Sequence, residues 1–191
     1  MSSLKILLRF SLVFFFHCSL SSARSPFTSS FIKASCNHAR YPQVCCDTLS
    51  PYASTIRISH KVLLRTSLNA TMLTAESTVT TMNMKTKRGK VGLQSVGASE
   101  DCIELLQDSI YQLQNSIDRL DGDNRDINLF ISDISTWVSA ALTDLTTCTD
   151  ELTTMDSNSV SNADFMGRLN HLTKMTSNCL ALIVHCATGY A

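Results

Sequence analysis

Apolar side chains recur every three or four residues along residues 102–120, a spacing that places them on one stripe of an α-helix. Ser99 is a candidate N-cap for this helix, and Glu100 and Asp101 suit its first turn. Turn-forming residues at 121–124 predict where it ends. The stripe consists of Cys102, Leu106, Ser109 or Ile110, Leu113, Ile117 and Leu120.

Two further stripes have the same helical spacing. Because only a short turn separates the first of them from the helix at 102–120, we expect these two helices to form an antiparallel hairpin. The first stripe contains Ile127, Phe130, Ile131, Ile134, Trp137, Val138, Ala141, Leu145 and Cys148, and the second contains Phe165, Leu169, Leu172, Thr176, Cys179, Ile183 and Cys186.

A looser apolar pattern over residues 51–84 predicts one long helix before these three. Its apolar positions are Ile56, Val62, Leu63, Leu68, Met72, Ala75, Val79 and Met82. Residues 85–97 hold four basic side chains and three glycines, which predicts a solvated basic linker. Four amphipathic helices can bury their stripes together in an up-down-up-down four-helix bundle, so the expected fold class is all-α.

The N-terminus indicates export. Lys5 and Arg9 precede an apolar run, and small residues follow at 21–23, so we predict a signal peptide at 1–23 and one domain at 24–191. The run from Phe10 to Leu20 is too short to span a bilayer, which argues against a membrane anchor. The whole chain has 16 basic and 16 acidic residues, and removing Lys5 and Arg9 leaves the domain with a charge of −2. This charge favours neither nucleic acid nor a membrane as partner.

Seven cysteines remain after residue 23, and most should pair in an oxidising compartment. Antiparallel packing would bring Cys102 and Cys148 to the same end of the bundle, and closing that loop would stabilise the fold by at most about 4 kcal/mol. Cys36 could close a short hairpin with Cys45, although Cys46 is an adjacent competitor. We expect Cys179 and Cys186, which lie on an apolar stripe, to be buried thiols rather than metal ligands.

Several motifs together resemble the plant invertase and pectin methylesterase inhibitors. They are Cys36, the turn at 41–45, the Asp-Cys pair that opens the helix at 102, the Trp-Val-Ser-Ala-Ala-Leu-Thr-Asp run at 137–144 with Thr-Cys at 147–148, and Leu-Thr-Lys-Met-Thr-Ser-Asn at 172–178. The resemblance covers roughly residues 30 to 184. It implies a four-helix bundle with an N-terminal helical hairpin, stapled by disulfides Cys36–Cys45 and Cys102–Cys148.

The resemblance also implies a function. Members of this family inhibit either pectin methylesterase or acid invertase, and invertase-directed members commonly carry a Pro-Lys-Phe motif that this chain lacks. We therefore expect a secreted, non-covalent inhibitor that forms a one-to-one complex with pectin methylesterase in the cell wall, with cell-wall or vacuolar acid invertase as the alternative target. The chain ends at Ala191 with no β-rich catalytic segment, which favours a separate inhibitor over the pro-region of an esterase.

Two polar stripes form a candidate target interface. On the helix at 102–120 four residues share the side opposite Cys102 and Leu113, and on the next helix four hydroxyl residues share one side. Because solvated helix faces usually carry Lys and Glu, a stripe made of hydroxyls suggests a surface for a polar, sugar-binding cleft. The two stripes are Gln107, Tyr111, Gln114 and Asp118, and Ser132, Thr136, Ser139 and Thr143.

Other functions have less support in the sequence. An enzyme would need a nucleophile with a base, paired carboxylates or a set of metal ligands, and the sequence shows none of these combinations. The candidate histidines are scattered along the chain; they are His38, His60, His171 and His185. We therefore expect no catalytic residue, metal or cofactor. A secreted lipid carrier is the alternative of another class, but the chain is long and has no Cys-x-Cys motif. Asn69 begins an Asn-Ala-Thr triplet and is the candidate N-glycosylation site.

Overall fold

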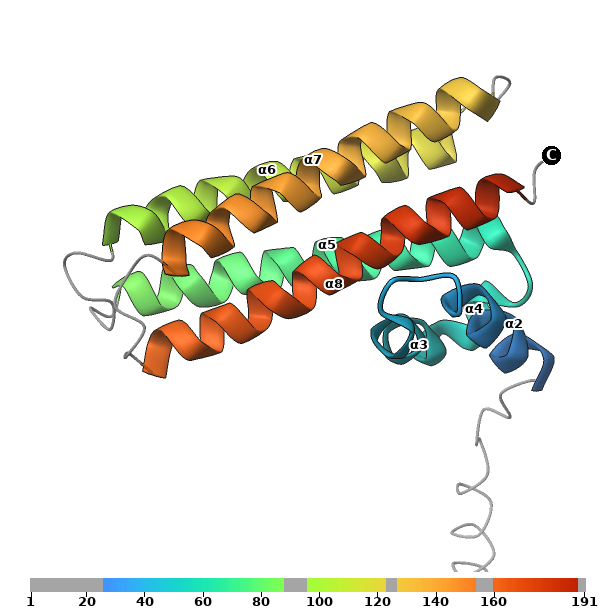
Figure 1. Cartoon of the computed structure of the whole chain (residues 1–191), viewed down its shortest axis with the longest axis horizontal. Helices are drawn as coiled ribbons and strands as arrows, with labels where there is room; N and C mark the ends of the chain where they lie inside the picture. Colours follow the sequence, from blue (N-terminus) through green and yellow to red (C-terminus); the bar gives the residue numbers. More distant parts are fainter. Residues whose placement is uncertain (1–25, 88–95, 123–126, 154–159, 189–191) are drawn as a thin grey trace, which may run out of the picture.

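Four long helices pack side by side in a computed structural model that describes residues 26–87, 96–122, 127–153 and 160–188. The predicted signal peptide lies outside these residues. The long helices are α5 (His60–Lys87), α6 (Val96–Asp121), α7 (Ile127–Thr153) and α8 (Val160–Thr188). Each packs on the next and α8 returns to α5, with successive helices running in opposite directions (Figure 1). The predicted all-α, up-down-up-down bundle is confirmed.

The predicted stripes of α6, α7 and α8 form the bundle core. Leu113, Ile134 and Leu172 are each fully buried, and the residues between them on the outer faces are mostly exposed. Burying a large aliphatic side chain contributes about 1.5–3 kcal/mol, so three such stripes supply much of the driving force for folding. Thr176 is also buried on the α8 stripe, where its hydroxyl donates to the Leu172 carbonyl.

A hairpin of short helices packs beside α5 and α8 at one end of the bundle (Figure 1). It consists of α2 (Pro26–Cys36) and α3 (Pro42–Leu49), joined by the disulfide Cys36–Cys45 with Cα atoms 5.6 Å apart. A 3₁₀ turn (Ser50–Tyr52) and α4 (Ala53–Ile56) then lead into α5. Ile32 and Leu49 are buried and join the core, so the predicted N-terminal hairpin is an integral part of the fold.

The prediction of one helix over residues 51–84 is wrong. Helix α4 ends at Ile56, because Arg57 takes a positive φ of 52°. Helix α5 then begins at His60, directly after Ser59. The Ser59 hydroxyl accepts a hydrogen bond from the Val62 N–H at 3.3 Å, as an N-cap does. No glycine or proline marks this break in the sequence, since a non-glycine residue supplies the unusual backbone conformation.

The start of α6 and the extent of the basic linker also differ from the predictions. Helix α6 begins at Val96, so Ser99 is a buried residue within the helix and not its N-cap. At the other side of the linker, Lys85 and Lys87 belong to α5, and the Lys85 ammonium donates to Asp164 of α8 at 2.7 Å. Residues 88–95 lie outside the described residues.

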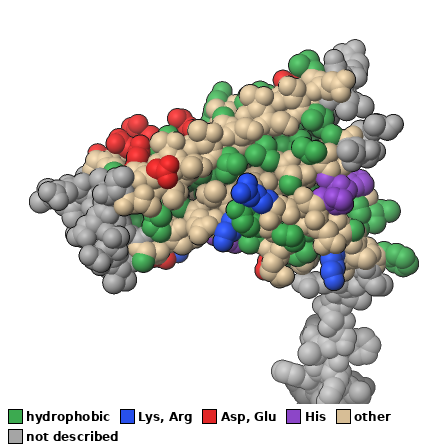
Figure 2. Space-filling model, in the orientation of Figure 1, with side chains coloured by type: hydrophobic (Ala, Val, Ile, Leu, Met, Phe, Trp, Pro, Cys, Tyr) green, Lys and Arg blue, Asp and Glu red, His purple; other side chains and the backbone are tan. Residues whose placement is uncertain are grey.

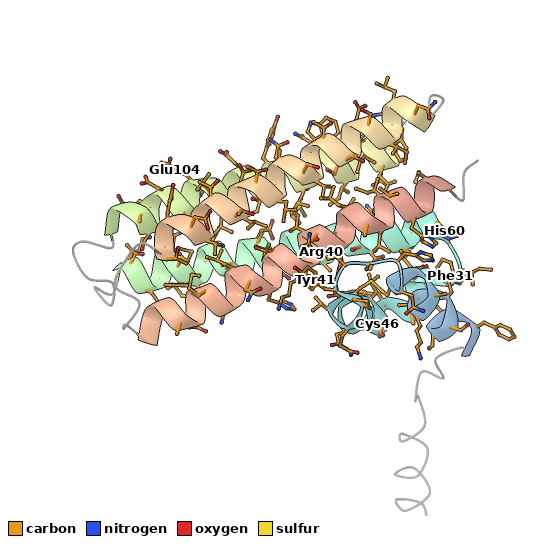
Figure 3. All side chains as sticks on the ribbon, viewed as in Figure 1. Phe31, Arg40, Tyr41, Cys46, His60 and Glu104 are labelled. Carbon is orange, nitrogen blue, oxygen red and sulfur yellow. A yellow bond between two sulfur atoms is a disulfide. The ribbon has the colours of Figure 1, made fainter. Side chains whose placement is uncertain are left out.

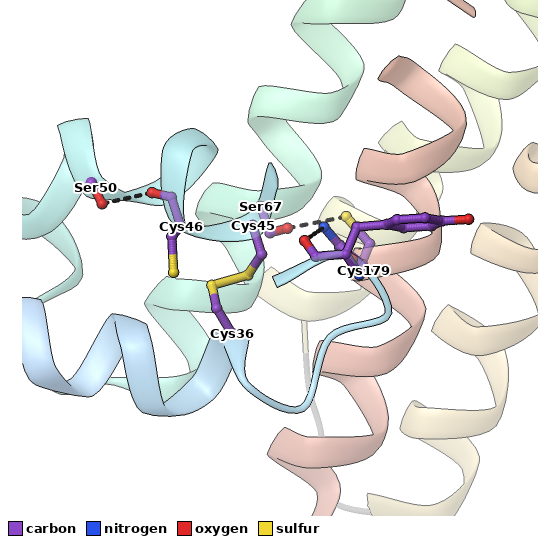
Figure 4. Close-up of a disulfide and its surroundings, with 8 residues drawn as sticks. Cys36, Cys45, Cys46, Ser50, Ser67 and Cys179 are labelled. Carbon is purple, nitrogen blue, oxygen red and sulfur yellow. Dashed lines mark hydrogen bonds between the residues drawn. A yellow bond between two sulfur atoms is a disulfide. The ribbon is translucent and has the colours of Figure 1, made fainter. Parts of the chain in front are cut away.

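Polar residues within the core explain why the α5 pattern is loose. Ser67 and Thr71 are buried. The Ser67 hydroxyl lies 3.1 Å from the Cys179 sulfur (Figure 4), and the Thr71 hydroxyl lies 3.4 Å from it. Thr71 also donates to the Ser67 carbonyl at 2.8 Å. Each buried hydroxyl is therefore satisfied, and α5 can turn polar residues toward the core without a large penalty.

Within the described residues, the remaining cysteines form a second disulfide and three thiols. Cys102 at the start of α6 is bonded to Cys148 near the end of α7, with Cα atoms 4.6 Å apart. Cys179 and Cys186 are free and buried, and burial raises the pKa of the Cys186 thiol to about 12. Cys46 is half-buried beside the hairpin disulfide, and burial raises the pKa of its thiol too (Figure 4). These thiols are therefore protonated at neutral pH.

Candidate functional site

The two predicted polar stripes lie on the outer surface of α6 and α7. Tyr111 is 64% exposed, and Gln114 is half-buried with its amide donating to the Asp118 carboxylate at 2.7 Å. On α7 the Thr143 hydroxyl donates to the Ser139 carbonyl at 3.0 Å, so its free capacity is that of an acceptor. The exposed members of the two stripes are Gln107, Tyr111, Asp118, Ser132, Thr136, Ser139 and Thr143.

A groove between α6 and α7 joins part of these stripes. It brings together Tyr111, Asp118 and Thr136, while the other five stripe residues do not line it. We call this surface the α6–α7 groove. Its lining residues are Tyr111, Gln112, Asn115, Asp118 and Arg119 of α6, and Thr136, Trp137 and Ala140 of α7.

Five of the groove residues lie outside the two polar stripes that the sequence predicts. Gln112, Asn115 and Arg119 lie beside the predicted α6 stripe, on the flank that faces α7. Periodicity defines a polar stripe, but it does not say which flank of that stripe meets the neighbouring helix. Trp137 and Ala140 were predicted within or beside the apolar stripe of α7, and both are only half-buried. Their partial exposure is the feature that a sequence pattern cannot give.

Acidic side chains gather at the end of α6 and α7 that is remote from the hairpin, where Glu104 lies (Figures 2 and 3). Further along this pair of helices, Asp108 of α6 and Asp144 of α7 interact electrostatically. Burial raises the pKa of the Asp144 carboxyl, and the neighbouring Asp108 charge raises it further. The outer surface of α6 and α7 therefore has a negative electrostatic character, which favours basic groups on a partner.

Three histidines cluster at the hairpin end of the bundle, so the prediction that the histidines are scattered is wrong for them. The imidazole of His38 stacks on that of His185 with ring centroids 4.1 Å apart, and His60 meets His185 edge-on at 5.7 Å. Phe31 of α2 packs against His60 at 5.0 Å (Figure 3). Burial lowers the pKa of His185, and the charges of His38 and His60 lower it further. The cluster joins the hairpin, α5 and α8 through ring contacts.

A second groove lies between α5, α8 and the hairpin. Its walls carry Tyr52, Leu73, Ser77 and His171, together with the ion pair between Asp164 and Arg168. The hydrogen bond from Lys85 is the largest cause of a lowered pKa of Asp164, which keeps that carboxyl ionised. A carboxylate held in this way is a poor general acid. Among residues 26–87, 96–122, 127–153 and 160–188, no group of three His, Cys, Asp or Glu side chains is arranged to hold a metal ion.

The family model described as plant invertase/pectin methylesterase inhibitor matches residues 30–182. The chain belongs to this inhibitor family. The match includes most of α2, all of α3, α5, α6 and α7, both disulfides, and α8 as far as Leu182.

Relatives in this family include three with 31–36% identity. Pectinesterase inhibitor 10 of Arabidopsis thaliana is 36% identical over 158 residues, which is 80% of this chain but only 50% of that protein. Pectinesterase inhibitor 11 of the same plant is 34% identical and covers 90% of each chain. The 21 kDa protein of Daucus carota is 31% identical over 86% of this chain and 87% of its own length.

Two solved structures share the fold of this family member. A mutant form A of a pectin methylesterase inhibitor from Arabidopsis aligns with a TM-score of 0.64 at 19% identity, over 84% of this chain and 97% of that one. A pectin methylesterase inhibitor from Arabidopsis thaliana aligns with a TM-score of 0.56 at 20% identity, over 82% and 95%. At these identities the likeness establishes the fold.

Two further features of this inhibitor-family chain bear on its environment. Asn69, the candidate glycosylation site, lies half-buried on α5. None of the helices in the described part of the chain combines the length and apolar character that crossing a membrane requires.

Proposed function

We propose that this protein inhibits pectin methylesterase by binding it non-covalently in a one-to-one complex and blocking its pectin-binding cleft. Its family membership supports this proposal, as do relatives named pectinesterase inhibitors. Binding of this kind would limit the de-esterification of cell-wall pectin.

The observation that carries the proposal is the polar outer surface of α6 and α7. These helices pack closely on each other and are bonded through Cys102–Cys148, so the surface is rigid before it meets a partner. A rigid surface loses little conformational entropy on binding. Its hydroxyl and amide groups suit a cleft that evolved to bind a polysaccharide, whose own surface is rich in hydroxyls.

Acid invertase is the alternative target in this family. The chain has no Pro-Lys-Phe sequence, the motif that invertase-directed members commonly carry. This favours pectin methylesterase over invertase.

The decisive experiment titrates the purified, disulfide-bonded protein into plant pectin methylesterase and follows released methanol. We expect saturable inhibition at a one-to-one ratio. A parallel titration of acid invertase, with released hexose as the readout, should show none. Inhibition of invertase alone would reverse the assignment, and inhibition of neither enzyme together with lipid uptake would favour a carrier.

We also propose that the protein acts in the cell wall after removal of residues 1–23. The amphiphilic N-terminus and the two disulfides support export to an oxidising compartment. N-terminal sequencing of material from extracellular fluid should begin at Arg24. Treatment with a glycosidase specific for N-glycans tests occupancy of Asn69, since a mobility shift that disappears in Asn69→Gln would show a glycan there.

A further inference from the structure

Two cations flank one aromatic ring where the hairpin meets α8 (Figure 3). The guanidinium carbon of Arg40 lies 5.9 Å from the centroid of the Tyr41 ring, and the ammonium nitrogen of Lys174 lies 5.7 Å from the same centroid. Both backbone polar groups of Tyr41 are bonded to Asn178, which lies one turn after Lys174 on α8. The fold therefore fixes the ring and holds two positive charges beside it.

Neither of these two cations is neutralised by an acidic neighbour. Arg40 is exposed and Lys174 half-buried, and neither forms an ion pair with a residue that the structure describes. The helices of the hairpin carry one acidic residue, Asp47, and α8 has none after Asp164. Because like charges repel each other, an anion that binds beside both cations relieves their repulsion. This surface therefore favours a negatively charged ligand.

The opposite charge dominates the other pair of long helices. Helix α7 has four acidic residues and no basic one, and α6 has six acidic residues and one basic one. In the space-filling view, Lys and Arg side chains lie near the middle of the face that carries α8, and acidic side chains gather at the end of α6 and α7 remote from the hairpin (Figure 2). A polyanion is therefore attracted to α8 and repelled by the surface proposed for the enzyme.

The positive surface continues along α8 into the second groove. Residues three apart are neighbours on a helix surface, so Lys174 lies beside His171 and His171 beside Arg168. The Arg168 side chain is 42% exposed, and its Nε lies 3.6 Å from Asp164, which leaves the other four N–H donors of the guanidinium for a ligand. The same groove presents the exposed ring of Tyr52. The cations are thus spread along a track, which suits a polymer better than a single small anion.

A polysaccharide that bears carboxylates has the matching chemistry. A guanidinium can bind a carboxylate through two parallel hydrogen bonds, and a tyrosine offers an apolar face together with a polar hydroxyl. Each methyl ester that pectin methylesterase removes leaves one carboxylate on the pectin chain. The de-esterified product is therefore a polyanion, whereas fully esterified pectin is neutral.

We propose that this surface of α8 and the hairpin binds de-esterified pectin, with the polymer's carboxylates on the three cations and a sugar ring against Tyr52. This rests on the proposed function in the cell wall, and it adds a second ligand to the inhibitor. The protein would be retained where de-esterified pectin has accumulated, with α6 and α7 left for the enzyme. We call this surface the α8 basic surface, and it consists of Arg40, Tyr41, Tyr52, Arg168, His171 and Lys174.

Binding to immobilised polygalacturonate, followed by biolayer interferometry, tests the proposal. The wild-type protein should bind saturably, and added salt should weaken the binding because the contacts are ionic. Pectin of high methyl-ester content should bind at least about tenfold more weakly, since its carboxylates are masked. Arg40→Gln and Lys174→Met should each weaken binding to polygalacturonate about threefold, and the double variant about tenfold.

Lys61→Met on α5 is the matched control. Lys61 is a half-buried lysine outside the α8 basic surface, and like Lys174 it forms no ion pair with a described residue. The control variant has the same net charge as Lys174→Met and should bind polygalacturonate like the wild type. Circular dichroism and thermal melts show whether each variant is folded.

Three results of the binding assay would overturn the proposal. They are no binding of the wild-type protein to polygalacturonate, equal binding to the esterified and de-esterified polymers, and equally tight binding to polyglutamate, which would show attraction to any polyanion.

Inhibition of pectin methylesterase, measured on highly esterified pectin, separates this surface from the enzyme interface. Lys174→Met should inhibit like the wild type. If it lost inhibition but still bound polygalacturonate, the α8 basic surface would contact the enzyme and the proposal would be wrong. Because the polygalacturonate assay contains no enzyme, a wild-type protein that bound the polymer without inhibiting the enzyme would refute the proposed function alone.

Discussion

Asn178 of α8 forms two hydrogen bonds with the backbone of Tyr41, which lies 137 positions earlier in the chain. The side-chain oxygen accepts from the Tyr41 N–H at 2.8 Å, and the side-chain amide donates to the Tyr41 carbonyl at 2.9 Å. An asparagine side chain thus mimics a peptide group and attaches the turn of the hairpin to the bundle. Asn178 is only 2% exposed, so water does not compete for these bonds.

Replacing Asn178 by alanine should therefore lower the free energy of unfolding by about 2–4 kcal/mol, because both Tyr41 groups lose their partner in a partly buried place. Equilibrium urea unfolding measures the change. Asn170→Ala, on an exposed position of the same helix, should change stability by less than about 0.5 kcal/mol. Hydrogen exchange provides a local check, since the Tyr41 amide should lose protection in Asn178→Ala. Unchanged protection would show that this clamp does not hold the turn.

The two disulfides should differ in their contribution to stability. Cys102–Cys148 joins residues 46 positions apart and Cys36–Cys45 residues nine apart. In the chain-entropy model, removing the first costs about 4 kcal/mol and removing the second about 2.7 kcal/mol. Urea unfolding of the two paired Cys→Ser variants tests this order. A larger loss for the hairpin variant would mean that packing of the hairpin, rather than loop closure, dominates.

Stability should fall in mildly acidic solution because of the histidine cluster. The pKa of His185 in the folded protein is lowered, first by burial and then by His38 and His60, whereas an imidazole in the unfolded chain titrates near 6.5. The unfolded state therefore binds more protons as the pH falls below about 6.5. The contribution of His185 to stability is fully present above that pH and is lost as the pH drops toward its folded pKa.

His185→Leu tests this interpretation through urea unfolding at pH 7.5 and 5.0. The variant should lose less stability than the wild type between these two values. His171→Leu, which changes an exposed histidine on the same helix, should keep the wild-type difference. If His185→Leu also kept the full difference, the pH effect would have to come from other groups.

Bulky charged side chains on the α7 stripe should interfere with inhibition of pectin methylesterase. Thr143→Lys and Ser139→Arg place long cations on an exposed surface, so we expect weaker inhibition and unchanged helical circular dichroism. Thr80→Lys on α5 is a close control, because Thr80 is also exposed and its hydroxyl also donates to the carbonyl four residues earlier. Full inhibition by both α7 variants would remove this stripe from the interface.

The sequence by itself determined the helical architecture of α6, α7 and α8. Leu106, Ile134 and Leu172 are fully buried as their spacing predicts, because a regular helix turns every third or fourth side chain to the same side. In an antiparallel pair of helices the start of one lies beside the end of the other. The order of the residues along the chain therefore also predicted the contact between Cys102 and Cys148. These features depend on local periodicity and chain direction, and both can be read directly from the sequence.

Only the tertiary structure decided the features in which distant segments meet. The structure also revealed the break at Arg57, which no glycine or proline marks in the sequence. The meeting of His38 with His185 and the clamp between Asn178 and Tyr41 both depend on where the hairpin docks. Packing between elements sets these relations, and no periodicity within one element encodes them.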